Sequence, residues 1–593
     1  MPHSKQQLSL NLNWSRRDFV AAAGLFLATA GVILWQNAHL VILWDLSYVL
    51  DSAVRMAQGQ MPYRDFPFAH APLTFLIQAA LIRLTGRVFF HHVLYCALAG
   101  GLGTVLAWRM ALHTLRGRMA AAWTASLLLA APLTVLGIYC ILPHPSYDCD
   151  CALSILVVLL LLQRLTPDAA AVAAPRPAGS LLQPFLAGMA LVLPLFFKQN
   201  IGLPLLLAAL AAIGLLLAAA HIRRTPAYPP GTPALLAVLA GSATTLLAAG
   251  LLLHFTAGIG NYIHWTIQFA AQRRLPGLKN MLGVYTEPSL LWMLPCAGLA
   301  LALLLTPLAK ATWARLLALG LLAAPFLWTL FTLFLYDDAD ERGDSLLALW
   351  PLLLILAAAL TLFNLLRGLT LRALLPAILL VAIHGTLLSQ QLWGSTYAIW
   401  PLLLLLIAEM IAFLGAIKLP EAAARSLPLA PALAAVVAAT LLVCGGFYTA
   451  GEERLSYAQL PEGPLLHATL PQLAGMATRG NYLPAFEELL RFAGANIPVS
   501  DGLILLPGED PFYFATGRAP QFPVLLFDPA TDPYSPAQLV EQARARNIRW
   551  LIVKRNLQIK EDPTPQREAV LAALLGDFAL DRQLQGYDVY RRR

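Results

Sequence analysis

The stretch that decides the fold is GSLLQPFLAGMALVLPLFFKQNIGLPLLLAALAAIGLLLAAA, residues 179–220. Its two apolar runs, 179–197 and 201–220, are each long enough to cross a bilayer core, because a helix rises about 1.5 Å per residue and about 20 residues span the hydrocarbon. In lipid, every backbone N–H and C=O must be satisfied within the segment. Both runs are therefore predicted to be transmembrane helices, joined by a turn at Lys198-Gln-Asn200.

The whole chain has the composition of a polytopic α-helical membrane protein. Of its 593 residues, 59% are hydrophobic and 12% are charged, whereas a soluble protein normally carries about 25% charged residues. The net charge of +8 does not indicate nucleic acid. Lys and Arg stand in small groups beside the apolar runs, at alternate connections, as expected for cytoplasmic loops. We therefore predict no nucleic-acid partner.

The basic groups also predict the topology. The first apolar run is too long for a signal-peptide core, so we expect a retained first helix with a cytoplasmic N-terminus in the plasma (inner) membrane. A loop at 45–87 is expected outside, with interfacial helices at 45–58 and 72–85. About 13 transmembrane helices are predicted, at residues 19–43, 88–112, 119–140, 150–163, 180–197, 201–220, 233–254, 289–308, 315–336, 345–365, 373–388, 399–417 and 429–448.

The composition changes after the last apolar run, so residues 1–450 are predicted to form the transmembrane domain and 451–593 a small extracytoplasmic α/β domain. Strands alternate with helices there. The expected strands are 502–506, 523–527, 549–553 and 587–590, and the expected helices are 536–544 and 566–575. This domain carries no Gly-rich phosphate loop or nucleophile elbow. It is either a structural cap over the membrane face or an acceptor-binding module.

Ionisable residues at the outer ends of membrane helices are the candidates for chemistry, since such groups are costly near lipid. Asp45 is the first, directly after the first apolar run. A carboxylate at headgroup depth can act as general base for an acceptor hydroxyl that attacks a sugar C1. It can equally cap the interfacial helix that follows, a favourable position for Asp. The spacing alone leaves both interpretations open.

The loop after Asp45 carries a recognisable pattern, Asp45-x13-Gly-x2-Pro-Tyr-Arg-Asp-Phe followed by His-x-Pro-Leu. It resembles the first external loop of bacterial family C (GT-C) glycosyltransferases, which are related to dolichyl-phosphate-mannose protein mannosyltransferases and to the aminoarabinose transferases of lipid A. The resemblance implies that Asp45 is the catalytic base, although Leu46 replaces the Glu that usually follows. The close match covers residues 45–73. The pattern residues predicted to bind substrate are Tyr63, Arg64, Asp65 and His70.

Asp148 and Asp150 form a second acidic pair, in the predicted outer turn before the 150–163 helix. Two carboxylates at this spacing can ligate a hard divalent cation that neutralises a phosphate. The pair is similar to the second acidic motif of some family C enzymes, including oligosaccharyltransferases, where it helps to bind metal. Mannosyltransferase-like members work without metal. The alternative is a helix N-cap, so no cofactor is assigned beyond a possible divalent metal.

Lys198 interrupts an apolar stretch at an outer turn. It either extends its amine to water or binds the phosphate of a lipid carrier, and family members often carry a basic residue here. Arg273 and Arg274, with Lys279, lie on a second long outer loop. They form either a donor-phosphate clamp or a solvated surface. The acidic residues between 337 and 344 are expected to be a solvated loop.

These features predict a glycosyltransferase, of hexosyl or pentosyl type. It would move a sugar from a polyprenyl-phosphate donor to a lipid, glycan or protein acceptor at the outer face, with inversion at C1. Two other classes stay open. A transporter or flippase of lipid-linked or small substrates would show broken helices, inverted repeats and charges at the membrane midplane. A non-catalytic envelope scaffold would keep Asp45, Lys198 and the external loop apart.

Overall fold

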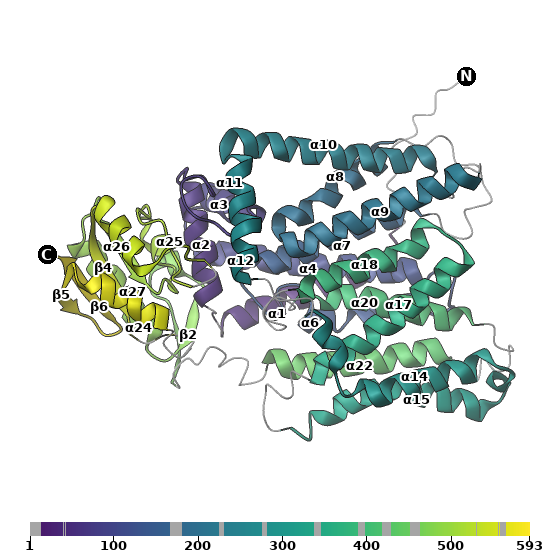
Figure 1. Ribbon diagram of the computed structural model, residues 1–593. Coiled ribbons are helices and arrows are strands. Elements are labelled where there is room, and N and C mark those ends of the chain that lie inside the picture. Colours follow the sequence, from purple (N-terminus) through teal and green to yellow (C-terminus); the bar gives the residue numbers. More distant parts are fainter. Residues whose placement is uncertain are drawn as a thin grey trace.

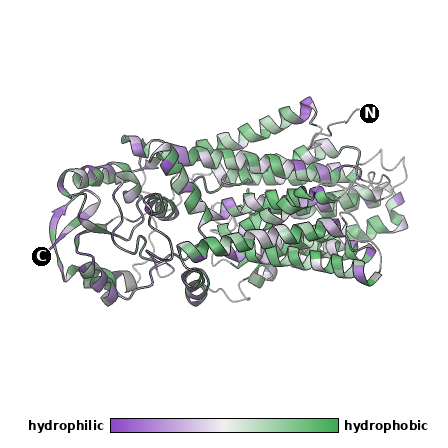
Figure 2. Ribbon diagram, turned by 90° about the horizontal axis from the view of Figure 1, so that it is seen from above, coloured by the Kyte–Doolittle hydropathy of each residue, from purple (hydrophilic) through white to green (hydrophobic). Residues whose placement is uncertain are grey.

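The computed structural model describes residues 14–39, 41, 43–166, 181–223, 231–274, 281–336, 345–388, 398–417, 428–450, 463–528, 531–555, 557 and 565–593. It is mainly helical, with a bundle of long helices and a smaller region of sheet and short helices at one end (Figure 1). The apolar residues are concentrated in the bundle, and polar residues increase toward the C-terminal region (Figure 2). The predicted fold class, a helical membrane protein with a small C-terminal α/β region, is confirmed.

Each predicted span overlaps a helix of the bundle. Seven helices within the described ranges are long and apolar enough to cross a membrane, namely α1, α4, α9, α10, α15, α17 and α22. The others are shorter or carry more charge, so the number of spans stays a prediction. The bundle consists of α1 (Arg16–Asn37), α4 (Phe89–Leu115), α5 (Ala122–Ala130), α6 (Leu133–Leu136), α7 (Tyr147–Leu165), α8 (Leu182–Phe197), α9 (Gln199–Arg223), α10 (Thr232–Thr256), α14 (Leu290–Leu305), α15 (Thr312–Thr332), α17 (Leu349–Arg367), α18 (Leu371–Leu387), α20 (Trp400–Ala416) and α22 (Leu429–Ala450).

The first helix ends earlier than predicted, at Asn37 instead of residue 43. The side chain of Asn37 donates to the carbonyl of Pro143 at 2.7 Å, and that of Gln36 donates to the carbonyl of Thr449 at 3.4 Å. The helix therefore ends at polar residues whose side chains donate hydrogen bonds to backbone carbonyls of neighbouring segments. A new helix, α2 (Leu43–Ala57), then begins. The prediction that Asp45 directly follows the first helix is therefore wrong, whereas its predicted place at the start of the next helix agrees with the first turn of α2.

The loop at 45–87, named the external loop after its predicted position, contains helices at both predicted places, α2 and α3 (Leu73–Thr85), and their interfacial position stays a prediction. The second long outer loop forms α11 (Ile259–Ile263), the π-helix η1 (His264–Phe269), α12 (Ala270–Arg274) and the 3-10 helix η2 (Gly283–Thr286). In Figure 1, α11 and α12 run across the end of the bundle that faces the C-terminal region. The short 3-10 helix η3 (Pro307–Lys310) joins α14 to α15.

The C-terminal region is built on a four-stranded sheet of order β3-β4-β6-β5, in which β3 and β4 are parallel and the other pairs antiparallel. The strands are β3 (Gly502–Leu506), β4 (Ile548–Lys554), β5 (Phe578–Gln583) and β6 (Tyr587–Arg592), with a separate hairpin pair β1 (Leu465–His467) and β2 (Ala477–Arg479). The helices are η4 (Pro471–Leu473), α24 (Tyr482–Asn496), α25 (Phe512–Thr516), α26 (Pro536–Ala545) and α27 (Pro565–Leu575).

Three of the four predicted strands and both predicted helices are confirmed in this region. Residues 523–527 do not form a strand. Arg55 of α2 donates to the carbonyl of Pro523 at 2.8 Å and also to that of Phe522. These carbonyls therefore accept hydrogen bonds from a guanidinium of the external loop and not from a neighbouring strand.

The external loop and the C-terminal region share one hydrophobic core, which includes Leu50 of α2, Phe75 of α3, Phe486 of α24 and Tyr587 of β6. The sequence predicted the loop as part of the transmembrane domain and the C-terminal region as a separate unit. The packing instead joins them, so α2 is held between the C-terminal region and α3 of the same loop.

Candidate functional site

Lys198 lies at the turn between α8 and α9, as predicted, and is only 8% exposed. Its ammonium forms an ion pair with Asp148, in the first turn of α7, and lies 5.2 Å from the centre of the Tyr147 ring. A buried cation needs such a partner, since desolvation costs several kcal/mol per ion. The pair places one positive and one negative group at the end of the bundle that faces the external loop.

Asp150 has a different role from Asp148, although the two are only two positions apart. Its carboxylate accepts three hydroxyl hydrogen bonds: from Tyr95 at 2.6 Å, from Tyr139 at 2.6 Å and from Thr74 of α3 at 2.7 Å. Asp150 thus anchors the interfacial helix α3 to the bundle. The described residues contain no group of three or more His, Cys, Asp or Glu that could hold a metal. The partners of Asp148 and Asp150 do not fit the predicted metal site.

An aromatic bridge connects α2 to Lys198. The hydroxyl of Tyr48 lies 3.2 Å from Nδ1 of His70, and the His70 ring is centred 4.8 Å from that of Tyr147. Gln199, next to Lys198, donates to the carbonyl of Ala69 at 3.3 Å. The external loop is therefore in direct contact with the turn that carries Lys198, whereas the scaffold alternative predicts that they stay apart.

Asp45 is exposed and lies one helical turn from Tyr48, on the same side of α2. Its position in the first turn is where the helix macrodipole favours a carboxylate. The capping interpretation and the catalytic interpretation are therefore compatible, because a carboxylate in the first turn of α2 is also exposed. The bridge through Tyr48 and His70 places Asp45 on a helix fixed relative to Lys198.

Tyr63, Arg64 and Asp65 shape the loop that presents His70. Tyr63 has a φ of 69°, and its hydroxyl donates to the carbonyl of His70 at 2.7 Å. Asp65 accepts from the backbone N–H of Met61 at 2.7 Å and pairs with Arg64 at 2.8 Å. Hydrogen bonding by Arg64 lowers the pKa of Asp65, and burial raises the pKa of Tyr63 well above its usual value. Of the predicted substrate-binding residues, His70 is the one that forms part of the aromatic bridge.

The side chains of the predicted phosphate clamp are not described by the structure. Arg273 and Arg274 end α12, but their side chains lie outside the described part of the structure, as do Lys279 and the acidic residues 337–344. All six cysteines are free, and five are buried.

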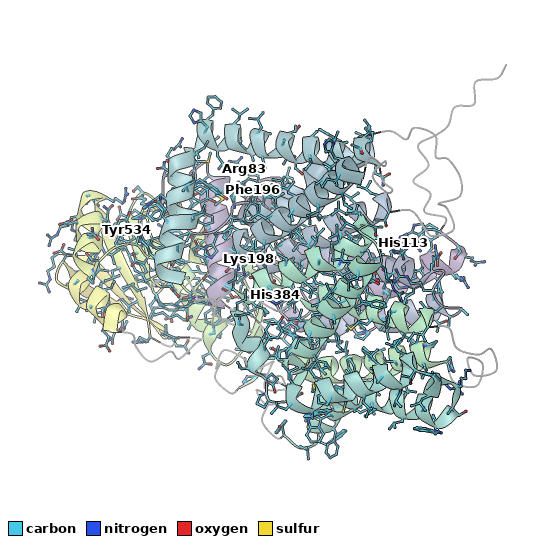
Figure 3. The ribbon with its side chains drawn as sticks, turned by 45° about the vertical axis from the view of Figure 1, so that its right-hand side comes forward. Arg83, His113, Phe196, Lys198, His384 and Tyr534 are labelled. Atoms are coloured by element: carbon cyan, nitrogen blue, oxygen red, sulfur yellow. The ribbon has the colours of Figure 1, made fainter. Side chains whose placement is uncertain are left out.

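The sequence analysis missed Tyr285 and His384. The Tyr285 hydroxyl lies 2.6 Å from Nε2 of His384, and their rings stack. Next to His384, the carbonyl of Gly385 accepts from Asn200 at 3.1 Å, so His384 lies at the same end of the bundle as Lys198 (Figure 3). A histidine near the end of an apolar helix was the available signal.

No protein-family model and no curated protein matches the chain. Among solved structures, it is similar to ArnT from Cupriavidus metallidurans bound to undecaprenyl phosphate, with 15% identity, 97% of this chain and 98% of that chain covered, and a TM-score of 0.44. It is also similar to the oligosaccharyltransferase AglB from Archaeoglobus fulgidus in complex with an inhibitory peptide and a dolichol-phosphate, with 11% identity, 91% and 70% coverage, and a TM-score of 0.42.

Both similar proteins are membrane glycosyltransferases with the GT-C fold, the kind of protein that the external-loop pattern resembles. With identities of 15% and 11% and TM-scores of 0.44 and 0.42, these similarities assign neither an activity nor a substrate to this chain. Both have to be argued from its own residues.

Proposed function

We propose that this protein transfers a sugar from a polyprenyl-phosphate donor to an acceptor hydroxyl at the outer face of the membrane, with inversion at the anomeric carbon. The observation that carries the proposal is the buried Lys198–Asp148 pair, connected by the aromatic bridge to the helix of the exposed Asp45. A buried cation and an accessible carboxylate at one membrane face are the two charges that such a transfer needs.

In this mechanism the donor lies with its lipid tail beside the helices and its phosphate at Lys198. Asp45 removes the proton from the acceptor hydroxyl, whose oxygen attacks C1 of the sugar. The bond between C1 and the phosphate oxygen breaks, and polyprenyl phosphate leaves with the electron pair. Lys198 stabilises the growing negative charge on that phosphate, because a fixed cation in a dry site costs no reorganisation during the reaction.

Asp148 positions Lys198 before the donor binds. The ion pair holds the ammonium in place in a site that is almost fully buried. The arriving phosphate then shares the ammonium with Asp148. Arg273 and Arg274 are proposed to close on the same phosphate from the second outer loop.

The experiment is sugar transfer by the purified full-length protein, with a panel of polyprenyl-phosphate sugars, comparing wild type with Asp45→Asn. We expect transfer to fall by about 100-fold or more in the variant, since general-base catalysis contributes about 10² to 10⁴. Donor binding should be unchanged, because the proposed phosphate contact is Lys198 and not Asp45. Transfer by Asp45→Asn at the wild-type rate would show that Asp45 is not the base.

A further inference from the structure

The chain turns sharply where α10 ends, and the helical stretch that follows lies across the end of the bundle (Figure 1). The backbone N–H groups of Ala257 and Gly258 both donate to the carbonyl of Leu253, at 3.1 and 2.7 Å. Gly258 has a φ of 85°, which glycine adopts without strain at the end of a helix. The stretch formed by α11, η1 and α12, residues 259–274, is called here the crossing segment. It begins where α10, a helix long and apolar enough to span a membrane, ends.

One face of the crossing segment packs on the bundle and on the external loop. Thr266 is buried, and its carbonyl accepts a hydrogen bond from the side chain of Gln199 at 3.2 Å. The Tyr262 ring is centred 5.1 Å from that of Tyr63 in the external loop. Because Gln199 directly follows Lys198, the crossing segment lies against the turn that carries the buried ammonium.

A second face carries three exposed isoleucines. Ile259, Ile263 and Ile267 are 40%, 39% and 54% exposed and follow one another at intervals of four residues. In an α-helix, with about 3.6 residues per turn, a step of four drifts about 40° past a full turn. In a π-helix, with about 4.4 residues per turn, the same step falls about 30° short. The first step lies in α11 and the second in the π-helix η1, so the two drifts nearly cancel and the isoleucines form a straight stripe.

The exposed surface of the crossing segment has a polar side next to this apolar stripe. His264 and Gln268 are exposed, each one position after an isoleucine, and Nδ1 of His264 lies 3.2 Å from Oε1 of Gln268. One residue is a step of about 100° around an α-helix, so these polar side chains point further from the bundle than the stripe does. An apolar side and a polar side on one helix are typical of helices that lie in a membrane–water interface.

The apolar stripe continues the exposed apolar surface of α10. Leu252 and Phe255, in the last two turns of α10, are 64% and 78% exposed. Ile259 follows Phe255 by four residues, immediately after the turn. Exposed apolar side chains on a membrane-spanning helix are in contact with lipid tails. Trp265 of the crossing segment is partly buried, and Trp is enriched where a membrane meets water. Lipid that covers the end of α10 therefore also reaches the isoleucine stripe.

We propose that the crossing segment lies in the membrane surface, with Ile259, Ile263 and Ile267 in the acyl region of the leaflet on the Lys198 side and the polar side in water. Bilayer lipid then holds one face of the segment while Gln199 holds another. The membrane itself thereby keeps the second outer loop against the Lys198 turn. Neither contact requires sugar transfer, so this surface can be tested whether or not the proposed function is correct.

The first experiment compares nitroxide labels attached to Ile263→Cys and to Gln268→Cys in the full-length protein, in nanodiscs of phosphatidylcholine and phosphatidylglycerol. The partly exposed Cys296 is changed to Ser in both. Oxygen concentrates among acyl chains, whereas a nickel chelate stays in water. The label at position 263 should collide more often with oxygen, and the label at 268 more often with nickel. Equal access of nickel to both labels would overturn the proposal. So would a label at 263 that is shielded from both reagents, since protein would then cover the stripe.

Adding polyprenyl phosphate to the same nanodiscs distinguishes bilayer lipid from the lipid tail of the donor. If bilayer lipid covers the stripe, oxygen access at position 263 should stay the same when polyprenyl phosphate is added. A fall in oxygen access on this addition would show that the stripe binds the tail of the carrier, and the proposal would be wrong.

Ile263→Asp and His264→Asp test what the lipid contact does for the crossing segment. Both variants put the same charge into the same helix, but only the first puts it on the apolar side. Because a charge is costly in lipid, hydrogen exchange of residues 259–269 in nanodiscs should rise about ten-fold in Ile263→Asp, the ratio that corresponds to about 1.4 kcal/mol. It should change little in His264→Asp. Equal exchange in the two variants would contradict a lipid contact at Ile263.

Discussion

The Oδ1 atom of Asp51 accepts a hydrogen bond from the backbone N–H of Phe514 at 2.7 Å, joining α2 to a segment 463 residues further along the chain. The other oxygen accepts from the N–H of Tyr513 at 3.3 Å. Ser47, Asp51 and Arg55 form one face of α2, and all three bond to backbone groups of the C-terminal region. The helix that carries the proposed base is therefore held in place by the C-terminal region.

The first prediction concerns the pH dependence of this contact. Burial raises the pKa of Asp51 well above its usual value; nearby Asp510 also raises it, while the two N–H donors and Arg55 lower it. The folded protein thus holds the proton more tightly than the unfolded chain. The resulting stabilisation is fully present below the ordinary Asp pKa of about 3.9 and is lost as pH rises through the folded-state pKa.

Asp51→Asn should remove this pH dependence, since the amide does not ionise. Thermal unfolding should be measured from below the ordinary Asp pKa to above the folded-state pKa of Asp51. As pH rises, the variant should gain stability relative to wild type. Ser47→Ala is the control, because it removes a hydrogen bond from the same face without removing a titratable group. A difference between wild type and Asp51→Asn that stays constant with pH would show that Asp51 does not titrate in this way.

Arg55 gives the second prediction. Burial lowers its pKa to about 10, so it is still charged at neutral pH. Arg55→Met would leave the carbonyls of Pro523 and Phe522 without their charged donor, and we expect a loss of about 2–5 kcal/mol in unfolding free energy. Hydrogen exchange should increase at residues 520–527. Arg55→Lys should not restore stability, because an ammonium cannot reach several carbonyls in a fixed fork.

The matched control for Arg55 is Arg64→Met. Arg64 also lies in the external loop, but its pair with Asp65 is exposed. Exposed ion pairs contribute at most about 1 kcal/mol, so the control should change stability little. Equal losses from the two variants would mean that Arg55 does not hold the C-terminal region in place.

Local patterns predicted much of this architecture, and long-range contacts decided the rest. Gly502–Leu506 is a strand in the structure because its apolar run is buried on both faces. Residues 523–527 have a similar apolar run, but the carbonyl of Pro523 accepts a hydrogen bond from Arg55, 468 residues earlier in the chain. The aromatic pattern at 66–75 gave no sign that it would form one core with Phe486 and Tyr587.

The site shows the same division. Asp45 and Lys198 were detectable because each is a charge beside an apolar run. The ion-pair partner of Lys198 was not detectable from the sequence. The spacing of Asp148 fitted a metal ligand or a helix cap equally well. Asp148 faces Lys198 while Asp150 accepts three hydroxyls, and only the packing of α3, α4 and α7 separates these roles.

The third prediction follows from those roles. Because the oxygens of Asp150 are bonded to hydroxyls and Asp148 is paired with Lys198, we expect transfer to be unaffected by EDTA. Asp150→Asn should lower unfolding free energy by about 1–3 kcal/mol, since an amide offers one acceptor oxygen in place of two. Loss of transfer on chelation, with recovery on adding Mg²⁺ or Mn²⁺, would instead support the metal site predicted from the sequence.

The last prediction separates the structural and functional roles of Lys198. Lys198→Met leaves Asp148 buried without its cation, which should cost about 3–5 kcal/mol of stability. Adding Asp148→Asn removes the uncompensated charge, so the double variant should recover much of that loss. Donor binding should not recover, because the phosphate has lost its cation; a charged hydrogen bond of about 1.5–3 kcal/mol corresponds to roughly 10- to 100-fold in affinity. Thermal unfolding and titration with polyprenyl phosphate measure the two effects. A stable double variant that binds polyprenyl phosphate as tightly as wild type would remove Lys198 from the donor site and leave the ion pair with a structural role alone.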